Sequence, residues 1–213
     1  MDIYWLGQSC FKIKGKSATI VIDPYDPEVT GLKLPKDLDA QVVLTTHTHK
    51  DHDNVTAVTG SPLIIAGPGE YEASGISIVG IKTFHDNVEG AQKGTNTIYH
   101  ILIDGINIVH LGDLGHELAE TQLGLIDQTD IVMIPACGTH TLEVETAVKV
   151  ISQLEPKIVI PMHYKIEGLK IDLETADFFL KEMGAENVET QPKLSITRDK
   201  LPDTTTVVVL SKS

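Results

Sequence analysis

His47-Thr48-His49-Lys50-Asp51-His52 places three imidazoles and one carboxylate within six consecutive residues. A packed core has no use for such a grouping, because buried polar groups cost free energy unless each finds a partner. Imidazole and carboxylate are ligands that zinc accepts readily and that manganese and iron also accept. The stretch therefore predicts a metal site rather than a polar loop with unrelated histidines.

The residues before this histidine-rich stretch explain how its side chains can converge. Val42 to Thr46 is apolar and β-branched, which is typical of a buried strand. Residues two apart at the end of a strand point to the same side, so His47 and His49 can hold one ion together. The chain must then turn, and Asp51 and His52 can face a second ion beside the first.

The charge balance of the 213 residues restricts the class of partner. Lys and Arg number 17 and Asp and Glu number 30, which gives a formal net charge of −13. Such an acidic chain repels nucleic-acid backbones and anionic membranes at long range. Bound divalent cations would reverse that field locally, so small anionic substrates are compatible with it.

The cysteines and the amino-terminal residues indicate the compartment. Cys10 and Cys137 are too few and too far apart for a disulfide framework, so we expect two reduced, buried thiols. Met1 to Leu6 is too short and too acidic for a signal peptide, and no apolar run approaches the length of a membrane span. The sequence therefore predicts a cytoplasmic protein.

The spacing of apolar segments predicts layered sheets. Short β-like segments fill the first 110 residues, and Asp104-Gly105 predicts a tight hairpin. Asp23 to Asp39, rich in Pro, Asp and Lys, is expected to be a long surface loop. Beyond residue 110, three helices (117–125, 143–154 and 173–183) are expected to alternate with three strands (131–134, 158–161 and 206–210). This alternation indicates sheets with helices outside.

Three further candidate ligands directly follow predicted strands. His85 follows residues 78–84, Asp113 follows 106–111 and His163 follows 158–161. Open sheets gather their functional groups at the carboxyl ends of strands. Each residue alone could be an ordinary buried histidine or a turn aspartate. Beside the histidine-rich stretch, a ligand role is the favoured hypothesis.

Nearly the whole chain resembles the metallo-β-lactamase superfamily, with these motifs in the family's order: Ile22-Asp23-Pro24, the histidine-rich stretch, His85, Gly112-Asp113 and His163. Three segments are similar to a bacterial and archaeal branch of small hydrolases that includes relatives of ascorbate-6-phosphate lactonase: Phe84-His85-Asp86, His110 to His116 and Pro135 to Leu142. The resemblance implies an α/β (α+β) fold, a four-layer αββα sandwich of two mixed sheets flanked by helices, as a single domain over residues 1–213.

The resemblance also implies two divalent metal ions, with zinc favoured over manganese or iron, and a ligand set. The first ion would be bound by His47, His49 and His85, and the second by Asp51, His52 and His163. Asp113 would bridge the two ions. Asp23 matches a family carboxylate that supports the histidine-rich stretch without touching metal.

These ligands imply hydrolysis. Two ions can hold a water whose pKa falls to about 7, so hydroxide is available to attack a small, anionic ester, lactone or phosphodiester. Asp51 or Asp113 would orient the nucleophile or accept its proton. His116 and His140 are the candidates for protonating the leaving group, with exposed loop histidines as the alternative interpretation. Lys93 and Lys165 could meet a phosphate or carboxylate, although solvated lysines are the ordinary case.

Three other functions compete with this hypothesis. A ribonuclease or another nucleic-acid phosphodiesterase of the same superfamily is disfavoured by the acidic charge. A di-iron oxygen or nitric-oxide reductase is disfavoured because that branch has a glutamate where this chain has His49, and no flavin domain follows. A non-enzymatic metal-binding module is disfavoured because every expected ligand is present. A small-molecule substrate is therefore expected, without nucleic acid or membrane as partner.

Overall fold

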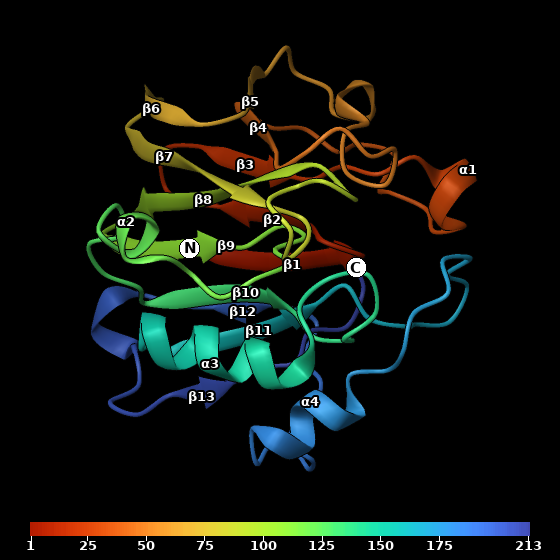
Figure 1. Cartoon of the computed structure of the whole chain (residues 1–213). Helices are drawn as coiled ribbons and strands as arrows, with labels where there is room; N and C mark the ends of the chain where they lie inside the picture. The colour runs from red at the N-terminus through yellow and green to blue at the C-terminus, as the bar shows by residue number, and fades with distance from the viewer.

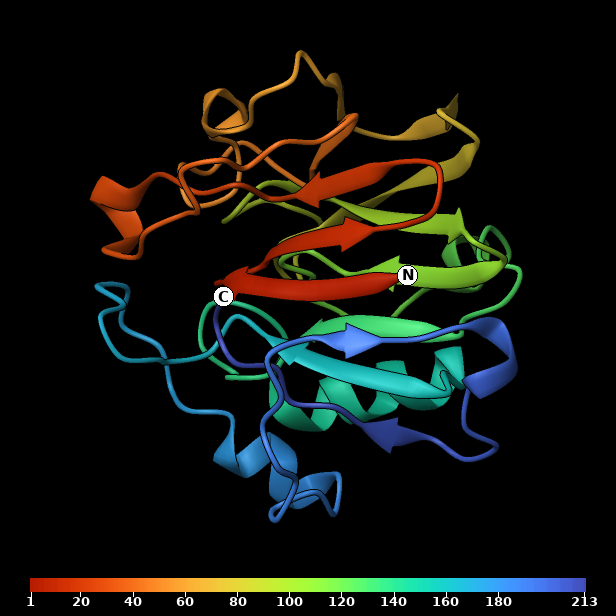
Figure 2. The same ribbon diagram turned by 180° about the vertical axis from the view of Figure 1, so that it is seen from behind.

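The computed structural model describes residues 1–213, and its strands form two mixed sheets packed face to face (Figures 1 and 2). The first sheet has the order β12-β1-β2-β3-β4-β5 and the second the order β13-β11-β10-β9-β8-β7-β6. The first sheet comprises β1 (Asp2–Gly7), β2 (Cys10–Lys14), β3 (Thr19–Ile22), β4 (Val42–Thr45), β5 (Leu63–Ala66) and β12 (Leu194–Ser195). The second comprises β6 (Gly69–Ala73), β7 (Ile76–Phe84), β8 (Thr95–Ile103), β9 (Ile106–His110), β10 (Ile131–Pro135), β11 (Ile158–Met162) and β13 (Thr206–Val207).

Side-chain alternation divides the core between the two faces of the first sheet. Ile20 and Ile22 of β3 and Leu44 of β4 face the second sheet and belong to the main hydrophobic core. Val21 and Val43, one residue out of phase, point to the outer face and belong to a second, smaller core. This period of two is the geometry of a strand buried on both faces, which explains why β3 and β4 read as continuous apolar runs.

Helices cover the two outer faces unequally. α3 (Val144–Leu154) buries Val144, Ala147, Val150, Ile151 and Leu154 and packs on the second sheet beside α4 (Asp177–Glu182). The other helices are short: α1 (Pro27–Thr30), α2 (Glu120–Leu123) and the 3₁₀ turns Val55–Ala57 and Arg198–Lys200. No helix combines the length and apolar character that crossing a membrane requires. The expected layered sandwich is confirmed, with its thinner outer layer over the first sheet.

The segment expected to be a surface loop, residues 23–39, is instead part of that outer layer. It contains α1, and Tyr25, Leu32 and Leu38 are buried in the smaller core. The Tyr25 hydroxyl donates a hydrogen bond to the Leu6 carbonyl oxygen (2.6 Å). The prediction was wrong because three well-spaced apolar residues bury this segment despite its polar composition.

Other local differences also have physical causes. The helix expected over 117–125 is confined to α2, because the Gln153 side chain bonds both backbone groups of Leu118 and holds it outside the helix. The helix expected over 173–183 begins only at Asp177, because the Glu174 carbonyl oxygen accepts a hydrogen bond from the backbone N–H of Lys165 instead of from a helical residue. The Asp104-Gly105 hairpin is confirmed: both residues have positive φ and Ile103 pairs with Ile106.

The strand directions place the carboxyl ends of six strands, and the loops that follow them, at one end of the sandwich. β1, β3 and β4 run in the same direction in the first sheet, and β7, β9 and β11 do so in the second. Six residues follow the carboxyl ends of these strands: Gln8, Asp23, His47, His85, Asp113 and His163. The functional site is therefore built where these strands end.

Candidate metal centre

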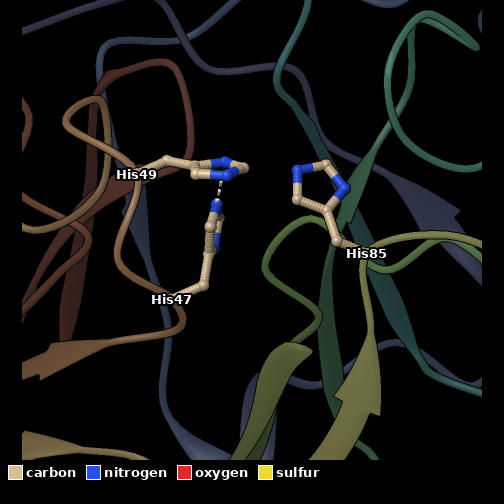
Figure 3. A group of neighbouring side chains, drawn as sticks. All are labelled: His47, His49 and His85. Atoms are coloured by element: carbon tan, nitrogen blue, oxygen red, sulfur yellow. Dashed lines mark hydrogen bonds between the residues drawn. The ribbon is translucent and has the colours of Figure 1, made fainter. Parts of the chain in front are cut away.

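The seven predicted ligands converge although they come from four separate segments of the chain. His47 Nε2 lies 3.1 Å from His49 Nδ1, and the His85 ring faces this pair from across the gap (Figure 3). Two imidazole nitrogens at this distance can share one N–H in a hydrogen bond or can turn their lone pairs to one metal ion. Their convergence is what the predicted strand-end geometry requires.

Asp113 lies at the centre of the cluster. Its Oδ2 atom is 3.2 Å from His85 Nε2, 3.3 Å from both His52 Nε2 and His163 Nε2, and 4.0 Å from His47 Nε2. The side chain is only 3 % exposed. One oxygen atom in contact with imidazoles from four positions is the geometry expected of a bridging carboxylate ligand.

The donor atoms form three overlapping groups, in each of which all atoms lie within 4.8 Å of one another. We call His47, His49 and His85 the first group, and Asp51, His52 and His163 the second group. The remaining group joins His47, His52 and Asp113, and so links the other two. The first and second groups coincide with the ligand sets that the family resemblance implied.

Asp23 determines which nitrogen two of the histidines present to the cluster. Its Oδ2 atom accepts hydrogen bonds from the Thr46 hydroxyl (2.8 Å) and from His52 Nδ1 (2.9 Å). Because the single hydroxyl proton of Thr46 is committed to Asp23, His47 Nδ1 must donate to Thr46 Oγ1 at 2.9 Å. Both Nε2 atoms therefore face the cluster, and Asp23 acts without reaching it.

The turn between β1 and β2 contacts three ligands from the other side. Gln8 Nε2 donates to Asp51 Oδ2 (3.0 Å), and Ser9 Oγ donates to Asp113 Oδ1 (3.3 Å). The Gln8 carbonyl oxygen accepts from His163 N (3.0 Å). Gln8 and Ser9 are both fully buried. Sequence reasoning missed them because polar residues between strands look like ordinary turn residues, although Gln8 follows a strand end as the ligands do.

Asn96 and His110 hold the turn that carries Asp113. Asn96 Oδ1 accepts from Asp113 N (3.1 Å), while its Nδ2 donates to the Leu111 carbonyl oxygen (2.9 Å). His110 Nδ1 accepts from Gly112 N (3.1 Å), so its Nε2 donates to the Ser9 carbonyl oxygen (2.9 Å). Burial lowers the pKa of His110, which keeps the ring neutral for this pair of bonds. Gly112 has a φ of 55°.

The electrostatics of the two groups differ. Burial, followed by the nearby His52 charge, lowers the pKa of His47 to about 3. Burial also opposes a charge on His163, but the Asp113 carboxylate outweighs it and raises the pKa of His163 to about 10. Asp113 likewise raises the pKa of His52 well above its usual value against the cost of burial. The carboxylates of the buried centre thus require positive charge beside them.

The donor set fits divalent metal ions. His52 Nε2 and His85 Nδ1 are buried and form no hydrogen bond, and unsatisfied buried nitrogens are rare in folded proteins. Five imidazoles and two carboxylates offer nitrogen and oxygen donors that suit zinc, manganese or iron. The strained backbone also favours a functional site, since Gln8, Asp23 and His163 all have positive φ.

A rigid loop over residues 85–94 carries His85. The Asp86 carboxylate accepts backbone hydrogen bonds from Val88, Gly90, Gln92 and Lys93, at 2.7–3.0 Å. Burial opposes the charge, but these four donors prevail and lower the pKa of Asp86 to about 2. A Cβ atom on Gly115 would lie 2.6 Å from Asp86 Cα, so glycine is needed where the Asp113 turn passes the loop.

The two candidate acids occupy different places. His140 is exposed and lines a cleft of about 250 Å³ together with His49, Asp51, His85, Asp113 and His163. His116 lines a neighbouring cavity, where its Nε2 accepts from Phe84 N (3.1 Å) and its Nδ1 donates to the Glu117 carbonyl oxygen (2.7 Å). Both ring nitrogens of His116 are therefore already bonded to backbone groups. Cys10 and Cys137 are free thiols, as expected.

Comparisons with known proteins agree with this architecture. Residues 2–163 match the family model described as beta-lactamase superfamily domain. A Thermotoga maritima protein, described as a zinc-dependent hydrolase of the metallo-β-lactamase superfamily, is 34 % identical in sequence. Its crystal structure superimposes with a TM-score of 0.80 over 98 % of this chain and 97 % of that one.

Two more distant relatives extend the comparison. A UPF0173 metal-dependent hydrolase of Thermoplasma volcanium is 29 % identical over 190 residues, covering 77 % of this chain and 83 % of the relative. The isothiocyanate hydrolase from Delia radicum gut bacteria is 17 % identical, with a TM-score of 0.71 over 92 % of this chain and 99 % of that one, and shows the shared fold alone. From the family match and the Thermotoga relative, the chain belongs to the metallo-β-lactamase superfamily.

Proposed function

We propose that this chain is a metal-dependent hydrolase that binds two divalent ions, zinc being the first choice, and cleaves a small, anionic ester, lactone or phosphodiester. The observation that carries the proposal is the contact of Asp113 Oδ2 with imidazole nitrogens of both ligand groups. The descriptions of the Thermotoga and Thermoplasma relatives as metal-dependent or zinc-dependent hydrolases support it.

The ligand groups have separate tasks in this proposal. The first group would hold one ion, the second group would hold the other, and Asp113 would join them. When bound, two such ions polarise the group to be cleaved and lower the pKa of a bound water to about 7, which supplies a nucleophile at neutral pH. Asp51, half-buried and fixed by Gln8, is the carboxylate best placed to orient that nucleophile.

The cleft above the ligands supports a small substrate and one proton donor. Its volume of about 250 Å³ and its largely polar lining suit a small polar molecule. Of the two candidate acids, we assign protonation of the leaving group to His140, because it lines this cleft and its ring forms no hydrogen bond. His116 would have to give up a backbone hydrogen bond before it could act.

Replacing Asp113 by Asn tests the proposal. We expect elemental analysis of the purified protein to give about two metal ions per chain, and Asp113→Asn to hold less than one. Hydrolysis of an activated ester or phosphodiester panel should fall by more than the roughly 10–100-fold typical of losing a supporting residue.

Asp130→Asn is the matched control for this experiment. Asp130 is equally buried but precedes β10, at the opposite end of the sheet, where it accepts hydrogen bonds from Asn107. Its replacement should reduce thermal stability and leave metal content unchanged. Full hydrolytic activity in a metal-free sample of the unmodified protein would contradict the proposed function.

A further inference from the structure

Lys93 is the one basic side chain, among all Lys and Arg residues, that lines the cleft above the ligands. It also lines the two cavities on either side, one beside His116 and one beside His47 and His49, and neither contains another Lys or Arg. Lys93 forms no ion pair with any carboxylate. Most Lys and Arg residues of this chain are also unpaired, so the position of Lys93 beside the candidate ligands is what distinguishes it.

The backbone of Lys93 is fixed relative to the ligand His85. Asp86, the residue after His85, accepts the Lys93 N–H at 2.7 Å. The loop closes where His85 N donates to the Gly94 carbonyl oxygen at 3.0 Å. The metal ligand and the lysine therefore sit at the two ends of one short, internally bonded loop, which keeps the spacing between them constant.

The ammonium group of Lys93 extends across the cleft to the opposite loop. Nζ donates to the His140 carbonyl oxygen at 2.6 Å. An ammonium has three donors, so this bond leaves two that can meet a ligand in the cleft. Two nearby carboxylates are already occupied, Asp86 by four backbone N–H groups and Glu117 by Lys149 at 2.8 Å. Glu143, Asp51 and Asp113 also line these spaces, and none of them forms an ion pair with Lys93.

The cavity beside His116 indicates what the rest of the ligand is like. It has a volume of about 420 Å³, adjoins the cleft through His85 and Lys93, and contains no hydrophobic residue in its lining. An apolar group placed there would gain little, because burial against polar groups leaves them unpaired. The non-reacting part of the ligand is therefore hydrophilic.

We propose that Lys93 binds a carboxylate or phosphate group on the non-reacting part of the substrate and so selects anionic, hydrophilic substrates. This inference rests on the proposed hydrolytic function. Lys93 supplies the charge, and Asp86 is a positioning residue that holds it at a fixed distance from His85.

A pair of matched esters tests the selectivity. Acetoxyacetate carries a free carboxylate on a small, hydrophilic leaving group, and 2-acetoxyacetamide has the same acetate ester with an uncharged amide. In the metal-loaded protein, Lys93→Met should lower kcat/KM for acetoxyacetate by about 10–100-fold, mainly through KM, as expected for losing a charge-assisted hydrogen bond. Activity on the amide analogue should stay within about twofold. Lys93→Arg should retain most of the preference.

A binding measurement separates this inference from the proposed function. Isothermal titration calorimetry with inorganic phosphate should show about tenfold weaker binding to metal-loaded Lys93→Met than to the unmodified protein. Lys181→Met, which removes an equal charge from exposed α4, should change neither readout. If the unmodified protein cleaves neither ester but Lys93→Met still loses phosphate affinity, the proposed ester hydrolysis is wrong and the anion-binding site at Lys93 is supported.

Two results would overturn the inference. An equal loss of activity on both esters would mean that Lys93 acts only by bonding the His140 carbonyl oxygen, because that contact is indifferent to substrate charge. Unchanged phosphate affinity in Lys93→Met would mean that its ammonium does not meet an anion in the cleft.

Discussion

The first and second ligand groups lie side by side around Asp113, yet they are built differently. The first group consists of three imidazoles, and one of them, His49, is exposed to solvent. The second group contains a carboxylate and the fully buried His52, and it is supported directly by Asp23 and Gln8. From this contrast we expect an ion bound by the first group to exchange with solvent more readily than an ion bound by the second.

The largest difference between the groups should follow from Asp23→Asn. An amide whose oxygen accepts from Thr46 N places its NH2 group, which is only a donor, where Oδ2 accepts from the Thr46 hydroxyl and from His52 Nδ1. We expect the second group to lose affinity by about 10–100-fold, as is typical for supporting residues of metal ligands. Stepwise titration of the metal-free protein with Zn²⁺ measures the two affinities separately.

Thr46→Val is the companion variant, because it removes the hydroxyl that links Asp23 to His47 while keeping the shape of the side chain. This substitution should lower mainly the Zn²⁺ affinity of the first group. Melting curves of both metal-free variants check that each still folds. If each variant lowers the Zn²⁺ affinity of both groups equally, the two groups are not supported separately as we expect.

A change of pH should have an effect of intermediate size on the difference in metal affinity between the two groups. His47, with a pKa lowered to about 3 by burial, is neutral from pH 6 to 8, whereas Asp113 raises the pKa of His163 to about 10 against burial. A metal ion entering the second group must displace such protons, so its affinity should fall by about tenfold per pH unit for each proton as pH decreases. The affinity of the first group should depend less steeply on pH, because His47 has no proton to displace in this range. Zn²⁺ titrations at pH 6, 7 and 8 give the slopes, and equal slopes for both groups would refute the contrast.

The smallest effect is expected from Ser9→Ala. The Ser9 hydroxyl touches Asp113 Oδ1 through a long hydrogen bond of 3.3 Å and contacts neither group separately. Its loss should lower the affinity for both ions to the same extent, by about two- to tenfold, which corresponds to one ordinary hydrogen bond. Competition with a chelating dye measures both constants. Selective loss of one ion would show that Asp113 serves one group more than the other.

The convergence of the candidate ligands could be predicted from the sequence because histidine and aspartate at strand ends are chemically unusual. The four ligand segments are far apart in the chain, but each follows an apolar run that specifies a strand. The supporting residues could not be found in this way. Ser9 meets Asp113 across 104 residues, a contact that depends on how the two sheets pack. Gln8 meets Asp51 across 43 residues, a contact between loops that follow two non-neighbouring strands of the first sheet.

The fold was predictable to a similar degree. Continuous apolar runs identified β4, β10 and β11, because both faces of these strands are buried. β6 was not expected, since Gly69–Ala73 is a largely exposed edge strand without an apolar pattern. The segment 23–39 was misjudged because composition does not reveal which few apolar residues of a polar stretch will be buried.

The loop held by Asp86 has a consequence for how relatives of this chain can diversify. Its carboxylate bonds only backbone N–H groups, which every residue except proline possesses. Apart from Gly90, whose φ of 81° favours glycine, the side chains of residues 87–92 can therefore be exchanged without loosening His85 or altering where position 93 stands. Asp86 thus allows the rim of the cleft to vary while His85, the candidate metal ligand, keeps its position.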